Sequence, residues 1–112
     1  MDLEFYWDDA GDPRARSGGR GDLAGARLAS FLESDIQGSD TFAQEILEGV
    51  ERVASGDLET WEATGNAHTL TVKRSGVVLE AELEEDAEPC RLSLEELHDA
   101  LVGWLELLES RE

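Results

Sequence analysis

Six acidic residues fall close together at positions 80–88, and this run is the strongest candidate for specific chemistry. Alternation predicts that its first three members share one outward strand face, with the others in the loop that follows. Side chains of one charge repel at this spacing, so stability alone favours interspersed lysines. We predict a docking surface for a basic protein, with a further acid from a neighbouring strand. The predicted partner-binding residues are Glu80, Glu82, Glu84, Glu85, Asp86, Glu88 and Glu62. A merely solvated face is the alternative interpretation of the same run.

Histidine and cysteine are too few to indicate a catalytic or metal centre. The chain has His68, His98 and the single cysteine Cys90, and none lies in an HExxH or CxxC pattern. We expect both histidines to be structural or exposed, and the cysteine to pack as a small apolar side chain. An enzyme that uses His68 with a carboxylate is the least favoured hypothesis. The sequence therefore predicts no catalytic residue, no bound metal and no cofactor.

Three further acids, Asp8, Asp9 and Asp12, lie in a segment rich in turn residues. Carboxylate oxygens suit hard cations such as Ca²⁺, but this spacing does not follow the EF-hand pattern. We expect an ordinary polar turn.

The overall charge indicates which partners the chain avoids. It has 112 residues, with 27 Asp and Glu against 9 Lys and Arg, a formal net charge of -18. Such a field repels nucleic acid and anionic membranes, and it attracts basic protein surfaces. It also destabilises the fold by self-repulsion, so added salt is expected to stabilise the protein.

Hydrophobic periodicity predicts the elements that position these residues. Alternating aromatics predict a strand over 3–7, and a second strand over 14–17 completes a hairpin. Apolar stripes predict a helix from Asp22 to Gly38, and a second from Asp40 or Thr41 to Gly56. The expected buried positions are Ala24, Leu28, Phe31, Leu32 and Ile36 in the first helix, and Ala43, Ile46, Leu47, Val50 and Val53 in the second.

The second half of the chain predicts strands and one closing helix. Strands are expected over 59–64, 68–74 and 77–84, with a short edge strand over 90–92 as a further option. Ser93 and Glu96 match a capping box, which begins a helix that ends near Glu109.

These elements predict a single α+β domain over residues 1–112. We expect a mostly antiparallel sheet of about five strands with helices on one face, in the order β-β-α-α-β-β-β-α. The first residues lack the basic and apolar regions of a secretory signal, and the lone cysteine excludes an internal disulfide. We therefore expect a cytoplasmic location.

Short motifs resemble a known family. The stretch 61–70, Trp-Glu-Ala-Thr-Gly-Asn-Ala-His-Thr-Leu, resembles the W-x-x-x-G-x-x-x-T-L segment of small bacterial YacL-like proteins. The aromatic opening strand and the ending from Leu92 to Leu105 are similar to that family as well. The resemblance implies a cytoplasmic bacterial domain without known catalytic residues. In size, acidity and expected layout the chain is also similar to immunity proteins of contact-dependent inhibition systems, which cover the basic clefts of toxins.

Two functions of different classes follow. The favoured one is a binding protein that occludes a basic protein surface, such as that of a nuclease toxin or a nucleic-acid-binding protein, with its carboxylates in the place of phosphates. The other is a housekeeping protein of a salt-adapted or GC-rich bacterium, whose acidity serves solubility and whose function lies in a small apolar cleft near Trp61. The distribution of acids over the folded surface discriminates between them.

Overall fold

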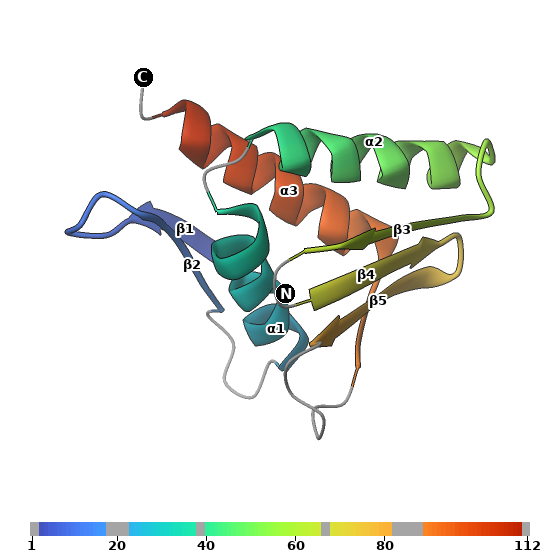
Figure 1. Ribbon diagram of the computed structural model, residues 1–112, viewed down its shortest axis with the longest axis horizontal. Coiled ribbons are helices and arrows are strands. Elements are labelled where there is room, and N and C mark those ends of the chain that lie inside the picture. Colours follow the sequence, from blue (N-terminus) through green and yellow to red (C-terminus); the bar gives the residue numbers. More distant parts are fainter. Residues whose placement is uncertain (1–2, 18–22, 38–39, 66–67, 82–88, 111–112) are drawn as a thin grey trace.

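The computed structural model describes residues 3–17, 23–37, 40–65, 68–81 and 89–110. Figure 1 shows the elements in their spatial arrangement. In chain order they are β1 (Leu3–Trp7), β2 (Pro13–Ser17), α1 (Leu23–Phe31), the π-helical turn η1 (Leu32–Ile36), α2 (Asp40–Ser55), β3 (Thr60–Thr64), β4 (His68–Lys73), β5 (Gly76–Ala81), β6 (Cys90–Leu92) and α3 (Leu94–Glu109).

The α+β class and the antiparallel pairing predicted from the sequence are confirmed. The strands divide over two sheets, a β1-β2 hairpin and a four-stranded sheet in the order β3-β4-β5-β6. The short strand β6 pairs with β5. Helices α2 and α3 lie next to each other over one face of the larger sheet (Figure 1). The opposite face carries no helix among the described residues.

Alternation along the larger sheet separates a buried face from an exposed one. The register places Trp61, Val72, Val77 and Leu92 in one row across the four strands. All four point to the helices, and three of them are at least 95% buried. The core continues into the helices through Leu28, Phe31, Leu32, Ile36, Ala43, Ile46, Val50, Val53, Leu97, Leu101 and Trp104. The apolar stripes predicted from the sequence therefore form the core, with Ala24 and Leu47 only partly buried.

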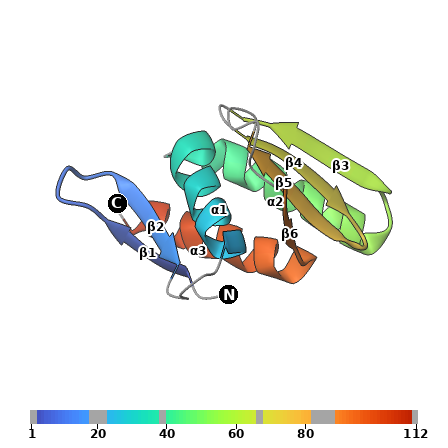
Figure 2. The same cartoon turned by 90° about the horizontal axis from the view of Figure 1, so that it is seen from below.

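The hairpin packs on helices and not on the larger sheet. Figure 2 shows α1 between the β1-β2 hairpin and the four-stranded sheet. Phe5 of β1 meets Trp104 of α3 edge-on, with 6.1 Å between ring centroids. Gly103 allows this approach, because a Cβ there would lie 2.4 Å from Phe5 Cε2. The half-buried face of β1 is thus covered by α3, so the hairpin needs no pairing with β3 or β6.

The ends of the two long helices follow sequence signals. The Ser93 hydroxyl accepts a hydrogen bond from the Glu96 amide, and the Glu96 carboxylate accepts one from the Ser93 amide, as the capping box predicts. Helix α2 ends before Gly56, which has a φ of 93° that favours glycine. The predicted cap Asp22 lies outside the described residues. None of the described helices combines the length and apolar character that crossing a membrane requires.

Candidate functional site

The first helix does not end as a regular α-helix. Its last turn, η1, is π-helical, because the Gln37 amide donates to the Leu32 carbonyl five residues earlier at 2.8 Å. Gln37 then adopts a positive φ of 53°, which is unusual for a residue with a side chain. Its carbonyl accepts a hydrogen bond from Trp104 Nε1 at 2.9 Å, which joins this turn to α3. The widened turn directs Leu32, Asp35 and Ile36 together into the interior.

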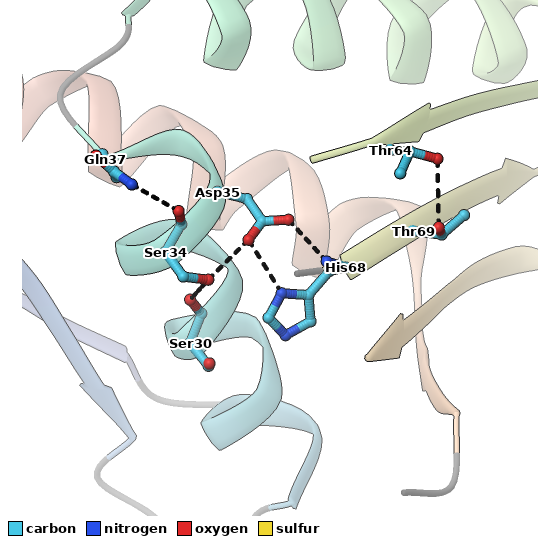
Figure 3. A network of polar contacts seen from close by, with 7 residues as sticks. All are labelled: Ser30, Ser34, Asp35, Gln37, Thr64, His68 and Thr69. Atoms are coloured by element: carbon cyan, nitrogen blue, oxygen red, sulfur yellow. Dashed lines mark hydrogen bonds and ion pairs between the residues drawn. The ribbon is translucent and has the colours of Figure 1, made fainter. Parts of the chain in front are cut away.

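Asp35 forms a buried polar contact with the start of β4 (Figure 3). Its Oδ2 accepts from the His68 amide at 2.9 Å, and its Oδ1 lies 3.2 Å from His68 Nδ1. The carboxylate side chain has no exposed surface and the imidazole retains 5%. Ser34 Oγ lies 2.7 Å from Asp35 Oδ1 and the same distance from the Ser30 carbonyl. An interior carboxylate is thus held by partners from its own helix and from a strand.

Neighbouring residues leave room for this pair or pack against it. A Cβ on Gly65 would lie 2.3 Å from Asp35 Oδ2, so glycine alone leaves room for the carboxylate. The Gly65 amide donates to the His68 carbonyl at 2.9 Å, which closes the β3-β4 connection directly beside it. The Phe31 ring meets the imidazole edge-on, with 5.8 Å between centroids. Asp35 therefore fixes both the orientation of His68 and the beginning of β4.

The arrangement is better suited to holding two segments of the fold together than to nucleophilic catalysis. An ionised carboxylate only accepts hydrogen bonds, so this contact favours the His68 ring form with a proton on Nδ1. In a Ser-His-Asp triad the hydroxyl contacts the second imidazole nitrogen. Here the Ser34 hydroxyl contacts the carboxylate instead, and the ring is almost completely enclosed. The pair joins η1 to β4, two segments far apart in sequence.

The sequence did not single out Asp35, although one signal was present. Asp35 lies three residues after Leu32 and one before Ile36, on the apolar stripe of the first helix. An acid at such a position requires a buried partner. His68, expected to be structural or exposed, is that partner.

The predicted acidic face is only partly described. Glu62 and Glu80 are exposed on the helix-free face of the larger sheet, on β3 and β5. Lys73 and Arg91 lie on the same face, and a hollow of about 360 Å³ there is bordered by Lys73, Glu80 and Arg91. The other predicted members, Glu82, Glu84, Glu85, Asp86 and Glu88, lie outside the described residues. The described part of this face is therefore balanced in charge.

Among the described residues, the largest local excess of negative charge lies on the opposite layer, which the sequence did not single out. Helices α2 and α3 together carry nine carboxylates and one guanidinium, that of Arg52. All of these acids are exposed except the half-buried Glu96 of the capping box. We call this set the helix-layer acids: Asp40, Glu45, Glu48, Glu51, Glu95, Glu96, Asp99, Glu106 and Glu109.

Two acids of the hairpin, Glu4 and Asp8, have partners within it. Arg16 Nε donates to Glu4 Oε2 at 2.7 Å, and this hydrogen bond and charge raise the pKa of the Arg16 guanidinium above its ordinary value. Asp8 Oδ1 accepts from the amides of Ala10 and Asp12, both at 2.9 Å. This carboxylate is thus used to build the turn, in agreement with the expected polar turn.

The remaining candidates occupy separate places. Cys90 is half-buried on β6, in the row of Leu79 and Leu70. His98 is half-buried on α3, with Nδ1 at 3.5 Å from Asp99 Oδ1. Within the described ranges no group of three His, Cys, Asp or Glu side chains is placed to hold a metal ion.

Trp61 packs against α2 at the edge of the sheet. A Cβ on Gly49 would lie 2.4 Å from Trp61 Cδ2, so the indole rests directly on the helix backbone. Beside it lies an open notch of about 280 Å³ lined by Glu45, Glu48, Gly49, Arg52 and Trp61. The ring therefore contributes to the core and also forms one wall of a surface depression.

In comparisons with known proteins, the chain matches no family model, no curated protein and no solved structure. The resemblance to the YacL-like proteins thus stays a prediction, carried by the motif around Trp61, the opening strand and the ending from Leu92 to Leu105.

Proposed function

We propose that this protein is a binding protein that occupies a basic surface of another protein. The observation that carries the proposal is the charge of the helix layer, which has nine carboxylates and only one arginine. Two of these acids, Glu106 and Glu109, lie in the last turn of α3, where the helix dipole disfavours negative charge. Their placement opposes local stability, which supports a role outside the fold.

The mechanism is steric occlusion assisted by electrostatic steering. A dense anionic layer on a rigid pair of helices accelerates encounter with a cationic partner, most strongly at low salt. The layer rests on a core that includes Trp104, Leu97 and Leu101, so the backbone positions that carry its acidic side chains are fixed. A nuclease toxin or a nucleic-acid-binding protein has the required basic cleft, and carboxylates there take the place of phosphates.

The test begins with capture of the partner from cells of the source organism at low salt, followed by identification by mass spectrometry. Association rates are then measured by stopped flow over a range of salt concentrations. Two variants remove the same number of charges from different places. One replaces Glu45, Glu48 and Glu51 with Gln on the helix layer, and the other replaces Glu80, Glu82 and Glu84 with Gln on the predicted strand face.

The variant that slows association and flattens its salt dependence identifies the contact surface. We expect the helix-layer variant to do so. A rate that neither variant changes contradicts the proposal, because steering then has no source on this protein.

A second function, solubility of a housekeeping protein in salt, is favoured by a different observation. Exposed acids also occur away from the helix layer, on the hairpin and before β3, as with Glu4, Asp57 and Glu59. General acidity serves this second function equally well. Capture of a partner with a cationic surface by the unmodified protein, and not by the helix-layer variant, contradicts this second function.

A further inference from the structure

We propose that the free edge of β3 and the notch beside Trp61 bind an extended, basic segment of a partner protein as an additional strand. This inference rests on the proposed function and names the mode of contact. Its basis is the backbone of β3, with the surrounding charges setting the chemistry of the segment.

The edge of β3 is open. Among the described residues β3 pairs only with β4, and it forms one border of the four-stranded sheet. In Figure 2 this border lies away from α1 and the hairpin. The opposite border, β6, is shorter and contacts α1. A further strand therefore has room at β3.

The register identifies which backbone groups are free. The Gly65 amide donates to the His68 carbonyl, so these two residues form a hydrogen-bonded pair. Hydrogen-bonded and non-bonded pairs alternate along an antiparallel ladder. Trp61 and Ala63 therefore direct their N–H and C=O groups to β4, and Thr60, Glu62 and Thr64 direct theirs outward. The edge thus offers evenly spaced donors and acceptors, as strand addition requires.

Side chains around the edge specify the chemistry of the added strand. The residue opposite Glu62 would lie on the helix-free face, beside that exposed carboxylate. The residues on either side of it would face α2 and reach the notch. There a long basic side chain can lay its methylenes on the Trp61 ring and place its charge by Glu45 and Glu48.

The charges favour a basic segment over a second copy of this chain. Acids near the edge include Glu45, Glu48, Glu59 and Glu62, and the nearby cations include Arg52, Lys73 and Arg74. Pairing β3 with β3 of a second copy would bring two such acidic edges together, which like-charge repulsion disfavours. The occupant we infer is an extended segment with lysine or arginine at alternate positions.

The test uses short, end-blocked peptides of alternating lysine and valine, titrated into the intact protein and followed by NMR. Two isomers carry equal charge, one N-methylated on the valine amides and the other on the lysine amides. An added strand uses the amides of only one set for bonding to β3. We expect one isomer to lose affinity by about tenfold or more while the other keeps it.

Protein variants test the same edge from the other side. Glu62→Pro removes an outward N–H and leaves the bonds between β3 and β4 intact, so it should fold and fail to bind. Glu62→Gln keeps the N–H and should bind with a smaller loss. The Glu62 amide should also exchange with solvent more slowly in the complex than in the free protein.

Equal binding of both methylated isomers overturns strand addition, and so does dimerisation of the free protein through β3. A glutamate-valine peptide separates this failure from that of the proposed function. If the two methylated isomers bind equally well, and both bind more tightly than the glutamate peptide, the protein prefers basic partners but does not bind them as an added strand. In that case the proposed function holds and strand addition fails. If the glutamate peptide binds as well as the lysine peptide, the preference for basic partners fails too.

Discussion

Replacement of Asp35 is the sharpest test of how the buried Asp35–His68 pair stabilises the fold. In Asp35→Ala the His68 amide and Nδ1 lose their acceptor in a site that is almost completely closed to solvent. An unsatisfied buried donor costs about 1–3 kcal/mol, and loss of one partner from a buried pair costs about 3–5 kcal/mol in total. A domain of this size has a stability of roughly 5–15 kcal/mol, so Asp35→Ala should lower Tm by about 15 °C or more.

Asp35→Asn should be much milder, because the imidazole can adapt. The amide oxygen can accept from the His68 amide in the place of Oδ2. The NH2 group then faces His68 Nδ1, which accepts if the ring carries its proton on Nε2 instead. We expect a loss of about 1–2 kcal/mol together with this change of tautomer.

Thermal and denaturant unfolding measure the stability changes, and imidazole ¹⁵N chemical shifts report the tautomer. Ser34→Ala is the matched control, since it removes one hydroxyl contact to the same carboxylate and should cost only about 1 kcal/mol. Equal stability of the alanine and asparagine variants, or an unchanged tautomer in Asp35→Asn, would refute the reasoning.

Five further outcomes follow from the packing and the charge. Gly49→Ala should destabilise by about 1–3 kcal/mol in denaturant unfolding, since its Cβ meets the Trp61 ring, and Gly65→Ala should do the same at Asp35. Ser93→Ala should cost about 1 kcal/mol through loss of the cap to the Glu96 amide. Glu109→Lys should raise stability by about 0.3–1 kcal/mol at low salt, and by less at high salt, because it reverses an unfavourable charge at the end of α3. Added neutral salt should raise Tm of the parent protein, and a flat or falling Tm contradicts self-repulsion between its carboxylates.

Local patterns in the sequence predicted most of the fold. Alternation placed β1, β4 and β5, and the capping box Ser93/Glu96 placed the start of α3, because these signals depend only on near neighbours. The division into two sheets was not predictable in this way. It depends on packing of the hairpin against α3 through the contact of Phe5 with Trp104. These two residues lie far apart in the sequence.

The candidate sites were less predictable for the same reason. The π-helical turn places Asp35 against His68, and no local pattern in the sequence predicts this long-range contact. The glycines that allow close contacts, Gly49 and Gly65, look like ordinary small residues until Trp61 and Asp35 are placed beside them. The helix-layer acids are spread over two separate segments, whereas positions 80–88 form a visible run.

The most direct test of the proposed function is the salt dependence of the affinity between this protein and its captured partner. We predict that affinity falls steeply as salt rises, and that Gln at Glu45, Glu48 and Glu51 removes most of this slope. An affinity that is independent of salt and unchanged in the neutralised variant would contradict the account.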